Sequence, residues 1–473
     1  MIFVRLIRCV GALVLPLAAC TSAPPVSDTS DDTQTEPEPV VCASTPGDHA
    51  TACLGPDCPI TADVELRCDD VDFGAIGVRV APAPDATYLA TSSERDWFLF
   101  RADATSASVV EDLPKTSLEA PVLIALDPAG AVHLAAYDGD DASETRGIVH
   151  LHPIDGAWSI EPVGEDGSVL DFSFGPDGVA NLWIERGGLP GEAHWLAQRE
   201  AGAWSSMTLP TIGDYNFQFT RGADGELVSL GVRILDTYEN QVLAVRDGVT
   251  SELGGINSSP GGFTSAPDVY RVTPPHPYAL DPAEPPFVAL IQDIDGYYFA
   301  WPAGDDYTLV ELPDSMTLVS KCDFGEATPC HEPCHEDSAG VEHEAAPIAI
   351  ARTADGVVWA AYHYRQRDRI VEFVERCTAD GCLCGGLDSE DHGTHELRLA
   401  RLVPDGSAPQ LVLTLPLAGP ADVAVDGTTL SWRSVDLAAF GTDLALAVRL
   451  REGPASAGMI RLLRIDTTRI PGA

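Results

Sequence analysis

Short apolar runs separated by glycine-containing turns recur along most of the chain. Residues 126–137, 174–184 and 221–230 each contain an apolar run, a turn with Asp and Gly, and a second apolar run. Short apolar runs bounded by turn residues predict strands. Asp-Gly favours a tight hairpin because both positions accept positive φ. The pattern therefore predicts an all-β fold built from hairpins.

The units repeat with a nearly constant period. Gly130, Gly178 and Gly225 are separated by 48 and 47 residues, and the Trp residues of two Gly-Ala-Trp-Ser segments, Trp158 and Trp204, lie 46 apart. A period of about 40–50 residues with four strand-like runs is the size of one β-propeller blade. We therefore expect a β-propeller.

The repeat turns set the expected number of blades. They lie at Asp85, Gly130, Gly178, Gly225, Gly296, Gly356 and Asp443. These turns predict seven blades, with six as the alternative. The last unit lacks a long fourth strand, and the alternating run at residues 60–67 is expected to supply it. Such pairing would close the ring and remove exposed sheet edges.

The repeat itself resembles known propeller sequences. Asp127 to Tyr137 reads Asp-x-x-Gly-x-x-His-Leu-x-x-Tyr, and a Gly-x-Trp follows. This resembles repeats of secreted bacterial proteins related to the sialidase-like and NHL-like superfamilies, and implies the fold alone. Arg469-Ile470-Pro471 stands at the C-terminal end, whereas sialidases carry such a motif at the first blade. No catalytic residue is proposed.

The N-terminal residues have the order of an export signal. Arg5 and Arg8 precede an apolar stretch, and Leu17-Ala18-Ala19-Cys20 follows. This order is typical of a secretory signal, and the last four residues resemble the bacterial lipobox. We expect a signal peptide at 1–19, a lipidated Cys20 and a disordered acidic linker at 20–41. A Cys-rich lead-in at 42–59 and the propeller at 60–473 complete the expected domains.

The expected location is the cell envelope. Thr21 rather than Asp follows the lipidated position, which by resemblance to enterobacterial lipoproteins favours the outer membrane of a Gram-negative bacterium. Lys and Arg total 28 against 72 acidic residues, for a net charge of −44, and loss of the two Arg of the signal gives −46. This charge excludes nucleic acid as a partner. No apolar run reaches the roughly 18 residues that a spanning helix needs.

The cysteines indicate disulfides. Cys9 leaves with the signal and Cys20 takes lipid, so ten remain. An even number in an exported chain favours disulfide bonds, whose connectivity the sequence leaves open. The candidates are Cys42, Cys53, Cys58, Cys68, Cys322, Cys330, Cys334, Cys377, Cys382 and Cys384.

Two loop insertions hold the candidate metal ligands. They span residues 321–345 and 377–396, and their histidines are His331, His335, His343, His392 and His395. Imidazoles with nearby acidic residues suit zinc. Asp-rich turns at 138–141 and 293–296 suggest calcium binding, but they lack the spacing of a twelve-residue calcium loop. Acidic disulfide-bonded loops are the main interpretation, with no cofactor, and a zinc or calcium site is the alternative.

These features predict a binding or scaffold module rather than an enzyme. The protein would be held on the membrane by lipid and would bind a protein, glycan or small ligand. The alternatives are a propeller hydrolase or lyase acting on polysaccharide, and metal binding by the loops. His133, Trp183, Trp359 and Tyr362, which alternate along predicted second strands, are expected mainly in the core.

Overall fold

The structure is a computed structural model in which β-strands dominate the described residues. It describes residues 42–47, 57–68, 78–92, 97–110, 113, 118–138, 147–154, 156–175, 177–185, 194–209, 215–221, 227–234, 239–246, 249–257, 268–273, 288–293, 296–303, 306–311, 316–317, 338–378, 381–389, 394–402, 409–416, 435–451 and 458–470. In these ranges the helical structure is one 3-10 turn, η1 (Thr467–Arg469). None of the described helical structure has the length and apolar character to cross a membrane.

Five sheets each contain four strands that are consecutive in the sequence. Sheet 1 has β3 (Arg79–Pro82), β4 (Thr87–Ser92), β5 (Trp97–Ala102) and β6 (Ala107–Val109). Sheet 2 has β7 (Leu118–Leu126), β8 (Val132–Asp138), β9 (Gly147–Ile154) and β10 (Ala157–Asp166). Sheet 3 has β11 (Ser168–Phe174), β12 (Ala180–Glu185), β13 (His194–Glu200) and β14 (Ala203–Thr208). Sheet 4 has β15 (Tyr215–Arg221), β16 (Leu227–Ile234), β17 (Glu239–Arg246) and β18 (Val249–Asn257). Sheet 5 has β19 (Asp268–Thr273), β20 (Val288–Asp293), β21 (Gly296–Ala303) and β22 (Asp306–Glu311).

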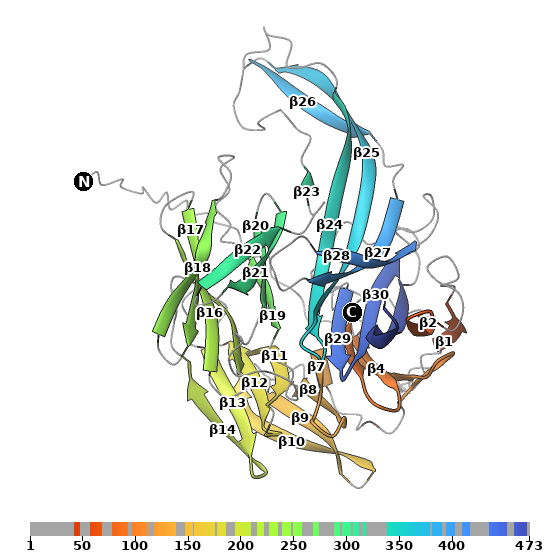
Figure 1. Ribbon diagram of the computed structural model, residues 1–473, viewed down its shortest axis with the longest axis vertical. Coiled ribbons are helices and arrows are strands. Elements are labelled where there is room, and N and C mark those ends of the chain that lie inside the picture. The colour runs from red at the N-terminus through yellow and green to blue at the C-terminus, as the bar shows by residue number, and fades with distance from the viewer. Residues whose placement is uncertain are drawn as a thin grey trace, which may run out of the picture. The chain divides into compact units, whose positions relative to one another are not determined.

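Two further sheets complete the described strands (Figure 1). Sheet 6 has β23 (Met316–Thr317), β24 (Ser338–Arg352), β25 (Val358–Thr378), β27 (Thr394–Leu402) and β28 (Gln410–Pro416), and β26 (Gly381–Ser389) pairs with β25. Sheet 7 has β1 (Cys42–Pro46), β2 (Ile60–Cys68), β31 (Gly458–Asp466), β30 (Asp443–Arg451) and β29 (Val435–Phe440). Four-stranded antiparallel meanders of this kind are the units of a β-propeller, so the structure supports the predicted all-β propeller class.

Alternating side chains give each sheet two packing faces. On β8, Leu134 and Ala136 belong to a core shared with sheet 1, whereas Ala135 and Tyr137 belong to a core shared with sheet 3. Successive strand residues point to opposite faces, which explains why these strands are apolar almost throughout. Similar apolar cores join sheet 7 to sheet 1 and sheet 6 to sheet 7. Burial between sheets is the main force that holds the fold together.

The predicted repeat turns share one hydrogen-bond pattern. The N–H of Asp127, Gly175 and Thr353 donates to the carbonyl oxygen four residues later, at 2.9, 2.8 and 3.0 Å. The fourth position of each turn is a glycine with φ of 78–85°. These three turns join β7 to β8 in sheet 2, β11 to β12 in sheet 3 and β24 to β25 in sheet 6.

One repeat turn has a different place. Gly296 opens β21 and pairs with Asp293 of β20, so this turn joins the second and third strands of sheet 5. In sheets 2 and 3 the repeat turn joins the first and second strands. The expected equivalence of Gly296 with Gly130 is therefore wrong by one strand. An Asp-Gly pair fits any tight hairpin, and sequence alone does not say which hairpin of a sheet it closes.

The strand expected from residues 60–67 pairs with the last strand of the chain. β2 runs antiparallel to β31, with Glu65 opposite Arg461. β1 adds to the outer edge of β2, and a disulfide joins Cys42 to Cys68 at one end of that pair. Cys58 is also disulfide-bonded. Residues from both ends of the described chain thus share sheet 7.

The insertion predicted as a loop at 377–396 is partly β-structure. β25 continues to Thr378, and β26 pairs with its distal half from Ile370 onward, while β27 pairs with the proximal half. The loop expectation is therefore wrong for β26 and for the last residues of β25. Residues 370–374 are rich in β-branched and aromatic side chains, with Ile370, Val371, Phe373 and Val374, which is a strand signal that the cysteine and histidine content obscured.

Candidate functional site

The described ionisable side chains form one concentrated cluster, between sheets 2 and 3. On β9, His150 and His152 lie on one face because they are two residues apart, and Leu151 packs on the other face. The hairpin to β10 pairs His150 with Glu161. The strand register thus brings two imidazoles and a carboxylate to one surface of sheet 2.

A third histidine stacks on the first two. The rings of His133 and His150 are nearly parallel, with centroids 5.1 Å apart, and those of His150 and His152 lie 4.8 Å apart. Nδ1 of His133 lies 2.9 Å from Nε2 of His150. Nδ1 of His150 in turn lies 2.9 Å from Oε1 of Glu161. A hydrogen-bonded series therefore runs from β8 through β9 to β10.

Sheet 3 supplies the remaining partners of Glu161. Nε of Arg199 donates to Oε1, and its NH2 group donates to Oε2 at 3.2 Å. Nε1 of Trp204 donates to Oε1 at 2.9 Å. Nε2 of His152 lies 3.6 Å from Oε2. Glu161 therefore ties sheet 2 to sheet 3 through charge-assisted hydrogen bonds.

A repeat turn provides a second carboxylate. Oδ1 of Asp127 accepts hydrogen bonds from the N–H groups of Ala129 and Ala131, at 2.9 and 2.7 Å. Oδ2 of Asp127 lies 3.7 Å from Nε2 of His133. The turn that begins the repeat thus places a carboxylate at the end of the histidine series.

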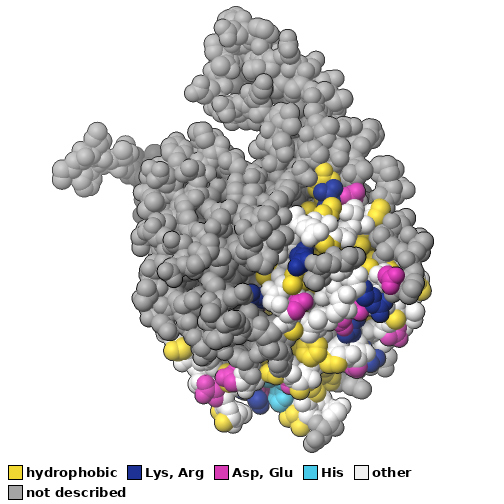
Figure 2. Space-filling view, in the orientation of Figure 1, with side chains coloured by type: hydrophobic (Ala, Val, Ile, Leu, Met, Phe, Trp, Pro, Cys, Tyr) yellow, Lys and Arg dark blue, Asp and Glu magenta, His cyan; other side chains and the backbone are white. Residues whose placement is uncertain are grey.

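Aromatic rings form the walls of the cluster. Phe174 packs edge-on to His133 with centroids 4.6 Å apart, and Phe172 and Trp204 pack edge-on to His150 at 5.7 and 5.4 Å. The side chain of His150 is fully buried, whereas 23% of Glu161 is exposed. The cluster therefore has a buried imidazole at its centre and partly exposed carboxylates, Glu161 and Asp127, at its two ends. In Figure 2, histidine is visible at the lower rim of the described surface, next to basic side chains.

Burial decides the protonation of two histidines. Burial lowers the pKa of His133 to about 4, against the opposing effect of Asp127. Burial also lowers the pKa of His150 to about 4, although its hydrogen bond to Glu161 acts in the other direction. Desolvation penalises the charged imidazolium, so both rings are neutral at pH 7.

For Glu161, hydrogen bonds rather than burial decide the pKa. Burial by itself raises the pKa of Glu161, but hydrogen bonds from Arg199, His150 and Trp204 outweigh it and lower the pKa to about 2. Glu161 is therefore ionised at neutral pH. The cluster combines a fixed negative charge with neutral imidazoles.

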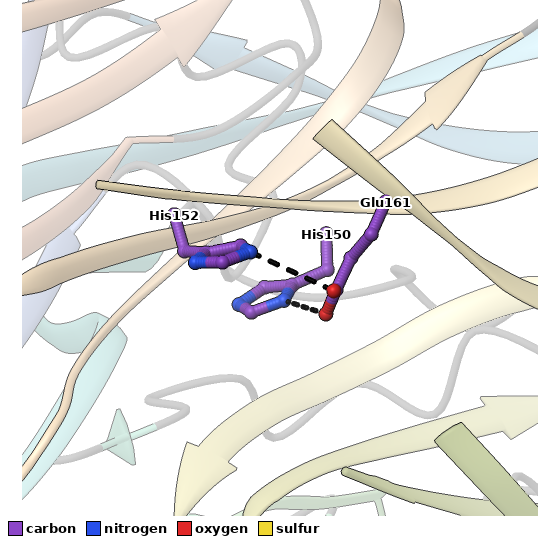
Figure 3. Close-up of side chains that lie close together, drawn as sticks. All are labelled: His150, His152 and Glu161. Atoms are coloured by element: carbon purple, nitrogen blue, oxygen red, sulfur yellow. Dashed lines mark hydrogen bonds and ion pairs between the residues drawn. The ribbon is translucent and has the colours of Figure 1, made fainter. Parts of the chain in front are cut away.

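The two imidazoles of β9 and Glu161 each offer one atom that can bind a metal. These atoms all lie within 4.8 Å of one another. Figure 3 shows the rings of His150 and His152 stacked face to face, with the carboxylate of Glu161 beside both. Neutral imidazole nitrogen and carboxylate oxygen are ligands of divalent transition metals.

The metal ligands expected from sequence lie elsewhere. His343 is on β24 and pairs with Gln366, and His395 is on β27 and pairs with Arg365. His331, His335 and His392 lie outside the described residues. The expectation of a metal site in these insertions stays a prediction.

The cysteine candidates divide in the same way. Cys42 and Cys68 form the disulfide of sheet 7. Cys377 and Cys382 are paired backbone positions on β25 and β26, and Cys384 lies on β26 opposite Glu375. The candidates Cys53, Cys322, Cys330 and Cys334, and the lipidation candidate Cys20, lie outside the described residues.

Sequence reasoning missed most of the cluster. It placed His133 with Trp183, Trp359 and Tyr362 as core residues, and the three aromatic residues are buried. The pattern His-x-His at 150–152, followed by a Gly hairpin that mirrors residue 161 onto residue 150, was the available signal. The contributions of sheet 3 had no signal, because they depend on packing between sheets.

Comparisons with known proteins give a likeness of fold. No family model matches the chain, and no curated protein matches it. The β-propeller domain of the Trilobed protease from Pyrococcus furiosus is 8% identical, with a TM-score of 0.40, over 82% of this chain and 96% of that one. YCF48 bound to D1 peptide is 10% identical, with a TM-score of 0.39, over 85% and 99%.

A third solved structure matches over a shorter part. TolB from Acinetobacter baumannii is 13% identical, with a TM-score of 0.28, and the match covers 53% of this chain and 60% of that one. The chain thus spans less than two thirds of that structure. At these identities and TM-scores the likenesses assign no activity, ligand or partner to this chain.

Proposed function

We propose that this protein is an exported lipoprotein whose seven sheets form a closed seven-bladed propeller that acts as a binding or scaffold module on the cell envelope. Lipid on Cys20 would anchor it in the outer membrane, and residues 20–41 would be the tether. The ligand would be a protein, a glycan or a small molecule held at one face of the ring.

The disulfide between Cys42 and Cys68 carries the proposal. Disulfides persist in oxidising compartments outside the cytosol, so this bond supports export. It fastens β1 to β2 in sheet 7, directly after the proposed tether. The pairing of β2 with β31 supports closure of the ring by strands from both ends of the chain.

The ionisable pairs support a scaffold rather than a catalyst. Asp63 pairs with Arg461 within sheet 7, and the carboxylate of Asp436 accepts a hydrogen bond from the N–H of Val80 across sheets 7 and 1. Glu161 likewise joins sheets 2 and 3. In each case the charge is used to fix one strand or sheet to another, which stiffens the framework on which binding loops would stand.

Labelling with a fatty-acid probe tests the anchor. The wild-type protein is expected to take up label and to partition into detergent, and Cys20→Ala is expected to abolish both. Cys9→Ala is the matched control. Because Cys9 lies within the proposed signal, this substitution should leave labelling unchanged. Labelled Cys20→Ala protein, or a wild-type protein that takes no label, would contradict the lipoprotein proposal.

Incubation with envelope polysaccharide tests the binding role. The full-length protein in liposomes is expected to leave the polysaccharide uncut, as measured by the number of reducing ends and by absorbance of unsaturated sugars. Cross-linking in cells should trap the module on its envelope partner. Reproducible cleavage that is abolished by Glu161→Gln or by a chelator would contradict the binding role and show that the protein is an enzyme.

A further inference from the structure

We propose that His150, His152 and Glu161 bind one divalent transition-metal ion of the zinc type between sheets 2 and 3. His133 and Asp127 would orient the ligands from behind. The proposal uses none of the histidines of the two insertions and does not depend on the lipid anchor or on the proposed binding role.

The three ligand atoms are arranged for one ion. Nδ1 of His150 lies 2.9 Å from Oε1 of Glu161, and Nε2 of His152 lies 3.6 Å from Oε2. Zinc bonds of about 2.0–2.2 Å in tetrahedral geometry place ligand atoms roughly 3.4 Å apart. These two separations bracket that value, and all three ligand atoms lie within 4.8 Å of one another, so side-chain rotations can bring them around one ion.

A proton count supports a cation in this place. Three contacts run in series from Asp127 through His133 and His150 to Glu161, at 3.7, 2.9 and 2.9 Å. Each neutral imidazole carries one N–H. Two neutral rings supply two protons for three contacts, so in every arrangement of tautomers at least one contact brings two lone pairs face to face.

A metal ion resolves that conflict. Bound between Nδ1 of His150 and Glu161, it takes the place of the missing proton. Nε2–H of His150 then donates to Nδ1 of His133, and Nε2–H of His133 faces Oδ2 of Asp127 at 3.7 Å. Carboxylates and other acceptors behind a ligating histidine fix its tautomer and raise its basicity in many metal sites.

The surroundings favour a borderline metal over calcium. Two of the three ligand atoms are imidazole nitrogens, which suit zinc, copper or nickel, whereas calcium takes six to eight oxygens. Three protein ligands leave a fourth position for water or for a group of a partner. The exposed part of Glu161 gives the ion a path from solvent.

Arg199 occupies the carboxylate when no metal is bound. Its guanidinium holds both oxygens of Glu161, and 27% of its side chain is exposed. The side chain can therefore turn outward to solvent when an ion arrives. The guanidinium and the ion would compete for the same negative charge.

Zinc titration of the full chain tests the proposal. The protein is purified without chelator, analysed for metal, stripped, and titrated with Zn²⁺ by calorimetry. His150→Asn/His152→Gln is the main variant, because each amide retains a polar group near the nitrogen it replaces. The wild type is expected to bind one equivalent more than this variant, and Co²⁺ should give the visible spectrum of a tetrahedral site in the wild type alone.

Two further variants keep the test decisive. His343→Asn/His395→Gln removes two loop histidines, and it should retain the ion and its Co²⁺ spectrum. If circular dichroism shows that the double variant of β9 is unfolded, Glu161→Gln is measured instead, with the same expected loss of one equivalent. Equal stoichiometry and affinity in the wild type and the folded variant would overturn the proposal and leave the cluster as a polar link between sheets.

Discussion

Arg461 holds Asp63 in a buried two-pronged ion pair. Its Nε and NH2 groups donate to the two carboxylate oxygens at 3.0 and 2.8 Å, and the side chains are 6% and 1% exposed. The residues are 398 positions apart and lie on β31 and β2. The pair therefore fixes the register between β2 and β31.

Asp63→Asn should destabilise the protein strongly. Removal of one charge leaves the guanidinium of Arg461 buried and uncompensated, at a cost of about 3–5 kcal/mol. The free energy of unfolding in urea measures this loss. Asp85→Asn is the matched control, because its pair with Arg101 is exposed and should contribute only about 0–1 kcal/mol. Equal effects of the two variants would contradict a special role for the buried pair.

Removal of the disulfide of sheet 7 should loosen β1. Cys42 and Cys68 are 26 residues apart, and a disulfide that closes a loop of this size is worth about 3–4 kcal/mol. Cys42→Ala/Cys68→Ala should unfold at a lower temperature and expose β1 to protease first. Ala43→Ser, an exposed change on the same strand, should leave both unchanged. A double variant as stable as the wild type would count against this role.

His133→Leu should weaken zinc binding without changing the number of ions. The variant keeps the three ligands but removes the acceptor of Nε2–H of His150. Loss of an outer partner of this kind typically weakens affinity by about 10–100-fold. Competition with a chromophoric chelator measures the affinity. Unchanged affinity would show that the ring of His133 serves packing against Phe174 alone.

Arg199→Gln should strengthen zinc binding. The guanidinium competes with the ion for Glu161, and its removal leaves the carboxylate charge to the metal. We expect affinity to rise about tenfold, which corresponds to about 1.4 kcal/mol. Arg101→Gln, on an exposed pair of sheet 1, should leave affinity unchanged. Weaker binding in Arg199→Gln would mean that Arg199 positions Glu161 for the ion.

The metal-free protein should lose stability as pH falls from about 6.5 to about 4. His133 and His150 have pKa values lowered by burial to about 4, whereas the unfolded chain binds protons near 6.5. The unfolded state thus binds more protons in this window, and acidification favours it. Urea unfolding in the presence of chelator measures the slope.

The charged neighbours of both rings set the size of that slope. Asp127 and Glu161 favour protonation and so oppose it, whereas Arg199 and His152 disfavour protonation. His150→Asn removes one titrating group and should make the slope shallower. A wild-type stability that is constant between pH 6.5 and 4 would show that the fold does not lower the pKa values of these rings.

The local part of the fold could be predicted from the sequence. Glycines at 130, 178 and 356 mark the hairpins β7–β8, β11–β12 and β24–β25. The sequence reveals them because the turn itself requires positive φ at the glycine. The alternating run of β2 identified a strand because apolar positions every two residues face one core. The turn at Gly296 was assigned to the wrong hairpin of its sheet, because Asp-Gly closes any hairpin equally well.

The candidate site could be predicted only in part. The spacing of His150 and His152 and the hairpin to Glu161 are readable from one sheet. The donors Arg199 and Trp204 come from the next sheet, 38 and 43 residues beyond Glu161. Whether these side chains reach Glu161 depends on the angle between the two sheets. That angle is set by packing over the whole interface, and no short sequence pattern encodes it.

The pairing of β2 with β31 also constrains the order of events in biosynthesis. β2 emerges from the ribosome almost 400 residues before Arg461, so β2 lacks its neighbouring strand β31 during most of synthesis. Contacts of such long sequence separation slow folding, and a strand edge waiting for its partner invites aggregation. A chain shortened by stalled translation before β31 would retain that open edge permanently.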